Sequence, residues 1–223
     1  MTVEFAAQRE KMVDGQLRTT GITSHAILAA MSRVPREEFV PEALRPFAYM
    51  DEDLAVHTGA DGLRRYLMEP APFARLLQLA GIGAEDIVLE IGCVTGYSTA
   101  VISCLAGSVI ALESDPVLAA QASANLSRLG YDNAVVVEGP LVEGHAAEAP
   151  YDFILLNGAV EEVPEALFAQ LRDGGRLLAI VGTGNTGTAT MWTSAGETRS
   201  SYRAFNAAVH LLPGFARQRS FVF

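Results

Sequence analysis

Two glycines and a glutamate are the residues of this sequence with the clearest chemical use. Gly92 and Gly96 enclose a short turn that follows an apolar run and leads into a helical one. Glycine lets a backbone turn tightly beside a ligand, and the N-terminus of the following helix offers free N–H groups to an anion. Glu113 ends the next apolar run, 17 residues after Gly96, where a carboxylate can accept hydrogen bonds from both hydroxyls of a ribose. Together these residues predict a nucleotide-binding site.

The elements that must position this site alternate between strands and helices. Strands are expected at 86–91, 108–113, 134–138, 152–156 and 176–181, with helices at 96–106, 116–129 and 161–171. Strands that are apolar on both faces and separated by helices predict a parallel sheet covered on both sides. Such sheets bind ligands at the carboxyl ends of their strands, where the glycine turn and Glu113 fall.

The rest of the chain flanks this unit. Residues 1–83 predict a helical and irregular extension of the same domain, with helices up to Gly21 and over 24–34 and 70–80, and residues 84–223 predict the α/β unit itself. Strand-like segments at 188–192 and 219–223 predict an antiparallel edge. The segment 182–187 matches the dinucleotide pattern G-x-G-x-x-G but leads into a strand, so it predicts a turn.

Composition and charge narrow the possible functions. Half of the 223 residues are hydrophobic and the net charge is −10, so a nucleic-acid partner is not expected. The N-terminus has no apolar signal region and no stretch approaches the roughly 20 apolar residues of a membrane span, which predicts a cytoplasmic protein without membrane contact. Two cysteines and four histidines without ligand spacing predict no disulfide framework and no metal site.

Several motifs resemble the protein-L-isoaspartate O-methyltransferase family, from about residue 9 to 182. They are Met12-Val-Asp-Gly-Gln-Leu17, Gly21-Ile22, Ile27-Leu-Ala-Ala-Met31, Val34-Pro-Arg-Glu-Glu-Phe-Val-Pro41, Ala48-Tyr49, Glu90-Ile-Gly92, Gly96-Tyr97, Ala149-Pro-Tyr-Asp152, Gln170-Leu171 and Gly174-Gly-Arg176. The resemblance implies a doubly wound, mostly parallel seven-strand sheet that binds S-adenosylmethionine and releases S-adenosylhomocysteine. It also implies methyl transfer to the α-carboxylate of an isoaspartyl residue in a protein or peptide, which starts repair of that residue.

The resemblance also implies where the site residues lie. The cofactor should contact Glu90, Gly92, Cys93, Thr95, Gly96, Tyr97, Ser98, Glu113, Ser114, Pro140 and Leu141. The acceptor should lie among Tyr49, Arg65, Tyr66, Met68 and Asn157. No catalytic residue is assigned, because methyl transfer to an anion depends mainly on positioning and needs no acid–base pair.

Three departures from the family pattern keep alternatives open. Val94 replaces the middle glycine of Gly-x-Gly-x-Gly, although catechol and caffeoyl-CoA O-methyltransferases also lack that glycine. Gly139-Pro-Leu141 stands where the family has Gly-Asp-Gly, and Met68 replaces the serine of Thr-Ile-Ser-x-Pro. One alternative is a metal-assisted O-methyltransferase for small molecules, although Asn157 stands where such an enzyme needs an acid. The other is a non-catalytic protein that keeps the fold. The sequence does not indicate the oligomeric state.

Overall fold

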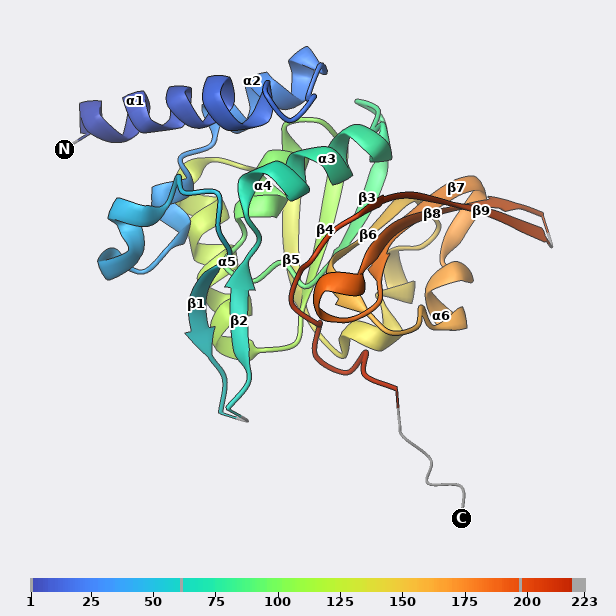
Figure 1. The fold of residues 1–223 in the computed structure, drawn as a ribbon. Coiled ribbons are helices and arrows are strands. Elements are labelled where there is room, and N and C mark those ends of the chain that lie inside the picture. Colours follow the sequence, from blue (N-terminus) through green and yellow to red (C-terminus); the bar gives the residue numbers. More distant parts are fainter. Residues whose placement is uncertain (1, 61, 197, 218–223) are drawn as a thin grey trace.

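The computed structural model describes residues 2–60, 62–196 and 198–217. Within them a seven-stranded sheet has the order β5-β4-β3-β6-β7-β8-β9 (Figure 1). Its strands are β3 (Ile87–Ile91), β4 (Ser108–Glu113), β5 (Ala134–Glu138), β6 (Tyr151–Val160), β7 (Leu171–Val181), β8 (Thr188–Ala195) and β9 (Thr198–Asn206). The neighbouring strands β5, β4, β3, β6 and β7 pair in parallel. Strand β8 pairs antiparallel with β7, and β9 pairs antiparallel with β8. The predicted fold class is therefore confirmed.

Strand order reverses at the centre of the sheet. The chain runs outward from β3 through β4 to β5 and then returns to place β6 on the other side of β3. This reversal leaves a crevice at the carboxyl ends of β3 and β6, the usual ligand position in such sheets. Gly92 follows β3 directly, and Asn157 lies in β6 beyond its last pairing with β3.

The helices begin and end at the expected kinds of residue. They are α1 (Thr2–Met12), α2 (His25–Arg33), α3 (Pro70–Ala80), α4 (Tyr97–Ser103), α5 (Pro116–Leu129) and α6 (Glu165–Phe168), and a π-helical turn, Val13–Leu17, continues α1. Ser24 caps α2 by accepting a hydrogen bond from the Ile27 N–H, and Asp115 caps α5 in the same way. Gly81 and Gly130 end α3 and α5 in the left-handed conformation. No helix among these residues is long and apolar enough to cross a membrane.

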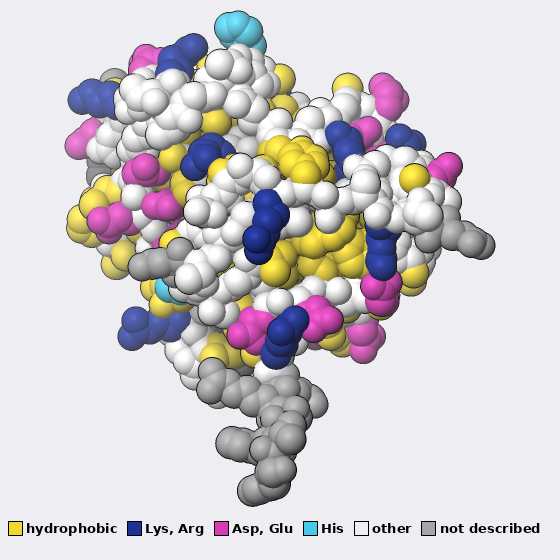
Figure 2. All heavy atoms as spheres, turned by 45° about the vertical axis from the view of Figure 1, so that its right-hand side comes forward, with side chains coloured by type: hydrophobic (Ala, Val, Ile, Leu, Met, Phe, Trp, Pro, Cys, Tyr) yellow, Lys and Arg dark blue, Asp and Glu magenta, His cyan; other side chains and the backbone are white. Residues whose placement is uncertain are grey.

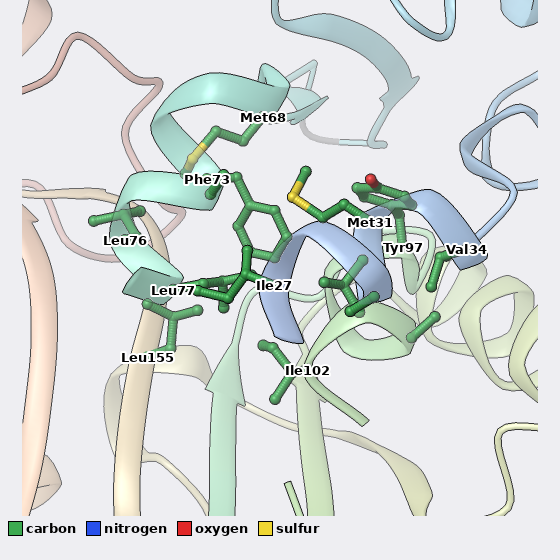
Figure 3. Packing of buried hydrophobic residues seen from close by; sticks show 14 of the residues in the cluster. Ile27, Met31, Val34, Met68, Phe73, Leu76, Leu77, Tyr97, Ile102 and Leu155 are labelled. Carbon is green, nitrogen blue, oxygen red and sulfur yellow. The ribbon is translucent and has the colours of Figure 1, made fainter. Parts of the chain in front are cut away.

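Side chains of the sheet alternate between two cores. Leu155 shares one core cluster with residues of α2 and α3, among them Met31 and Phe73, and lies near Leu77 of α3 in Figure 3. Its neighbours Ile154 and Leu156 point to the opposite face, where Leu167 of α6 and Leu212 cover them. The N-terminal extension therefore shares one continuous core with the sheet.

Two regions differ from the sequence expectation. Within 41–62, expected to be irregular, β1 (Leu54–Thr58) forms and pairs with β2 (Arg64–Leu67) in a separate antiparallel hairpin. The helix expected at 161–171 shrinks to α6, because Pro164 caps it and keeps the preceding residue out of helical geometry. Strand β7 then begins at Leu171, earlier than expected, and β9 supplies the antiparallel edge. The strand expected at 219–223 lies outside the described residues.

Candidate cofactor and acceptor site

The glycine turn is a tight, strained link between β3 and α4. Gly92 and Gly96 have φ values of 88° and 91°, and the Gly96 N–H donates to the Cys93 carbonyl at 2.9 Å. Val94 lies between them with a φ of 54°, which a β-branched residue rarely adopts and which costs on the order of 1–3 kcal/mol. The surrounding contacts must therefore hold Val94 in place, and one of them is a hydrogen bond from its N–H to Glu113 Oε2 at 2.9 Å.

Glu113 ends β4 beside this turn and is fully buried. The backbone N–H groups of Ser114 and Asp115 donate to its Oε1 at 2.8 and 3.0 Å. The guanidinium of Arg65, from β2, makes a bidentate ion pair with the same carboxylate at 2.6 and 2.8 Å. Both carboxylate oxygens are thus already paired within the chain.

A second buried carboxylate, Glu90, lies under the turn. It accepts hydrogen bonds from the Thr99 hydroxyl at 2.6 Å and from the Asn157 amide at 3.0 Å. Asn157 also donates to the Ser98 hydroxyl at 2.8 Å. Burial raises the pKa of the Glu90 carboxyl to about 7, although the hydrogen bonds from Ser98, Thr99 and Asn157 favour the charged form. This network ties the end of β6 to the start of α4.

A small cavity joins most of the residues expected to receive the acceptor. Arg65, Tyr66, Met68 and Asn157 all line it, and its volume is about 20 Å³. The Tyr66 ring stacks on His210 with 3.4 Å between centroids. His210 and Leu212 come from the C-terminal segment, where residues 210 and 212 hydrogen-bond to the backbone of Ala159.

Two expected site residues do not line this cavity: Tyr49 of the N-terminal extension and Tyr97, the first residue of α4. Tyr49 donates a short hydrogen bond to Glu37. Tyr97 packs edge-on against Phe39, and its position beside Phe73 is visible in Figure 3. Their expected roles toward acceptor and cofactor stay predictions.

The remaining predicted residues are mostly buried around the turn. Thr95 and Cys93 are fully buried, and burial raises the pKa of the Cys93 thiol well above its usual range, so this thiol is poorly reactive. Leu141 belongs to the second core, next to Pro140. The Gly139 N–H bonds to the Glu113 carbonyl at 3.0 Å, which places this loop beside the end of β4.

Sequence reasoning missed the contacts that close the site. His57 lies 3.1 Å from the Asp115 carboxylate, and His210 lies 3.6 Å from Asp53. Each pair joins residues far apart in the chain, and no local spacing indicated them. Arg36 belongs to one of the family-like motifs and had no expected role, yet it is fully buried and donates to the backbone carbonyls of Ala48 and Met68 at 2.7 Å.

The parallel sheet with a glycine turn and an acid at the ends of neighbouring strands defines the S-adenosylmethionine-dependent methyltransferase class. The family model described as protein-L-isoaspartate(D-aspartate) O-methyltransferase (PCMT) matches residues 7–209. The chain therefore belongs to this family of methyltransferases.

Individual relatives agree with this assignment. The chain is 42% identical to the protein-L-isoaspartate O-methyltransferase of Koribacter versatilis over 179 residues, which are 80% of this chain and 78% of that protein. It is 39% identical to that of Methanoculleus marisnigri over 175 residues, covering 78% and 77%. A solved protein-L-isoaspartate O-methyltransferase superposes with a TM-score of 0.80 at 27% identity, over 92% of this chain and 66% of that one.

A further solved structure shares the fold. It is a Plasmodium falciparum beta-aspartate methyltransferase (PCMT) in complex with S-adenosyl-L-homocysteine. It matches with a TM-score of 0.77 at 17% identity, over 92% of this chain and 97% of that one.

The family's cofactor can be tested against the residues present. The chemistry is suitable, because the buried carboxylate of Glu113 lies beside the glycine turn, where it could accept hydrogen bonds from the hydroxyls of a ribose. The space is restricted, because Arg65 holds both oxygens of Glu113 and the two hollows that Arg65 lines measure about 20 and 230 Å³, whereas ligand pockets are typically about 300–1,000 Å³. In the described arrangement the Glu113 carboxylate is therefore not free for a ribose.

Proposed function

We propose that this chain is an S-adenosylmethionine-dependent methyltransferase that esterifies a carboxylate of a protein or peptide. The observation that carries the proposal is Glu113, buried at the end of β4 beside the glycine turn in a chain of this family. In this proposal the cofactor lies against the turn and Glu113, with Ser114, Pro140 and Leu141 around its nucleoside. No acid or base is needed to activate an acceptor that is already an anion.

Two arginines support a carboxylate as the acceptor. Arg64 and Arg65 both line the cavity that also contains Tyr66 and Asn157. A guanidinium pairs with a carboxylate through two parallel hydrogen bonds, which would orient the acceptor oxygen. Arg64 is exposed and lines this cavity, whereas Arg65 is already paired with Glu113.

The isoaspartyl activity that characterises the family is expected to be weak. Met68 occupies the position of the family's acceptor serine, and a thioether donates no hydrogen bond. Tyr66 occupies the position of the threonine and is stacked on His210 rather than free. Loss of one donor to a carboxylate costs about 1.5–3 kcal/mol, so turnover should be about ten- to a hundredfold below that of a family member with both hydroxyls.

The test is transfer of labelled methyl from S-adenosylmethionine to an isoaspartyl peptide, beside its normal aspartyl twin. Selective but slow labelling of the isoaspartyl peptide is the expected result. Turnover equal to that of an intact family member would show that the two hydroxyls are dispensable. Absence of transfer to any peptide or protein carboxylate would overturn the proposed acceptor class.

A parallel arm of the assay addresses a small-molecule acceptor. Asn157 stands where a metal-assisted enzyme needs an acid, and the described residues contain no group of three or more metal-ligating side chains. Labelling should therefore survive EDTA. Loss of labelling on chelation and its recovery with Mg²⁺ would favour the metal-assisted alternative.

A further inference from the structure

Arg65 occupies the place that a ribose would take on Glu113. The side chains of Arg65 and Glu113 are 7% and 0% exposed. Glu113 accepts two hydrogen bonds from Arg65 and three from the N–H groups of Val94, Ser114 and Asp115. An ionised carboxylate has about four acceptor positions, so none remains for the hydroxyls of a ligand.

Arg65 also fills the space around this carboxylate. It lines two hollows, one of about 20 Å³ beside Asn157 and one of about 230 Å³ beside Ser114 and Asp115. The first is large enough for about one water molecule. The side chains of Leu212 and Arg65 also cover the glycine turn. A Cβ added at Gly92 would lie 2.7 Å from Leu212 Cδ2 and 3.8 Å from Arg65 Nη2.

Arg65 is carried by an element that is not hydrogen-bonded into the main sheet. Strands β1 and β2 of this hairpin (54–58 and 64–67) form a sheet of their own, which projects from the body of the molecule in Figure 1. Its base is held by the bond from Arg36 to the Met68 carbonyl and by the bond from the Glu69 N–H to Asp53 at 2.8 Å. Nearer the tip, the Arg65–Glu113 pair and the His57–Asp115 contact attach it to the nucleotide side of the sheet.

We propose that Arg65 is an internal latch, which holds the β1–β2 hairpin over the cofactor site and must leave Glu113 before S-adenosylmethionine can bind. This inference rests on the proposed function, since it concerns the same site. Release of Arg65 would free Glu113 and join the two hollows. A ligand that binds only an open minority state has its apparent affinity reduced by the fraction of open molecules. Removing the latch should therefore tighten binding.

The experiment titrates S-adenosylhomocysteine into the full-length chain by calorimetry, for the parent, Arg65→Gln and Arg203→Gln. Glutamine removes the charge and the bidentate fork at residue 65, whereas Arg203 is an exposed arginine of β9 that lines neither hollow and serves as the charge-matched control. Arg65→Gln should bind at least tenfold more tightly than the parent, and Arg203→Gln should bind like the parent. Equal or weaker binding by a folded Arg65→Gln overturns the latch.

Two further measurements distinguish failure of the latch from failure of the proposed function. Arg65→Lys retains a counter-charge for Glu113 but cannot form the fork, so it should bind with intermediate affinity even if the glutamine variant folds poorly. Hydrogen exchange of the parent should accelerate in residues 54–67 when the ligand is added, and unchanged or slower exchange there contradicts opening. Tight binding by the parent that Arg65→Gln does not improve removes the latch but leaves the proposed function. Absence of binding by every folded variant at millimolar ligand removes both.

Discussion

Glu113 illustrates, at the scale of one residue, how a carboxylate proposed to bind a ligand can already be satisfied by partners within the chain. The carboxylate is fully buried and would be costly without partners, and Arg65 and three backbone N–H groups satisfy it. A cofactor must therefore compete with interactions inside the chain. Because of this competition, the effect of substituting Glu113 on ligand binding should depend on whether Arg65 is present.

Glu113→Ala should weaken binding of S-adenosylhomocysteine at least tenfold in the Arg65→Gln background, where the carboxylate is free for the ribose. Each hydrogen bond to a charged group contributes about 1.5–3 kcal/mol, and 1.36 kcal/mol is tenfold. The loss should be smaller in the parent, because there the substitution also releases Arg65. Glu138→Ala is the control, since Glu138 pairs with Glu113 in the register of β4 and β5 but is exposed. Equal losses in both backgrounds would show that Arg65 and the ligand do not compete.

The place of Glu113 beside the turn could be predicted because it follows from a local pattern, an acid at the end of the strand after a glycine turn. The sequence did not predict the partner of Glu113, because 48 residues separate Arg65 from it. Arg65 was expected near the acceptor, and it does line the small cavity. Its pairing with Glu113 depends on how the hairpin folds over the sheet, which no local pattern encodes.

At the scale of elements, helices α3 and α5 could be predicted well because their ends are chemically marked. Pro70 and Pro116 begin them, and Gly81 and Gly130 end them. The β1–β2 hairpin lacked such signals: its strands have five and four residues, and they pair with each other rather than with the main sheet. Helix α6 was overestimated because the apolar periodicity extends past Pro164 in both directions.

Arg36 connects these elements, and Arg36→Lys should destabilise the protein by about 1–3 kcal/mol. Its guanidinium donates to the Ala48 and Met68 carbonyls and lies 4.6 Å from the centre of the Tyr97 ring. Lysine keeps the charge but cannot reach both carbonyls, so one buried acceptor loses its donor. Urea unfolding measures the change, with Arg33→Lys on the exposed side of α2 as the control. A difference from the control below about 0.5 kcal/mol would mean that water or a neighbouring donor replaces the lost bond.

At the scale of the whole molecule, the acidic balance is spread over the surface. The net charge is −10, and acidic and basic side chains are interspersed on the face shown in Figure 2 rather than gathered by sign. Four carboxylates are buried among the described residues, and two of them lie at the end of the sheet that forms the site. Glu90 and Glu113 lie there, on neighbouring strands. Burial raises the pKa of the Glu90 carboxyl, so protonation of Glu90 should contribute to the pH dependence of stability.

Glu90 gives this dependence a definite direction. Burial raises the pKa of its carboxyl to about 7 in the folded protein, whereas the ordinary value is 4.5. Between these values the folded state binds a proton that the unfolded state has lost, so the free energy of unfolding falls as the pH rises. The contribution of Glu90 is fully present below about pH 4.5 and is lost as the pH rises through about 7. This difference between the folded and ordinary pKa values corresponds to roughly 3 kcal/mol in the free energy of unfolding.

Urea unfolding at pH 5 and pH 8 measures this contribution. The parent should lose more stability over that range than Glu90→Gln, by up to roughly 3 kcal/mol, because the amide cannot ionise. The variant can keep both contacts, because its amide oxygen can still accept from Asn157 and its amide N–H can donate to the Thr99 hydroxyl, which is also an acceptor. Glu138→Gln, which changes an exposed carboxylate, should follow the parent. If Glu90→Gln and the parent lose the same stability between the two pH values, Glu90 is already ionised in the folded protein at pH 5, and the network of Ser98, Thr99 and Asn157 outweighs the cost of its burial.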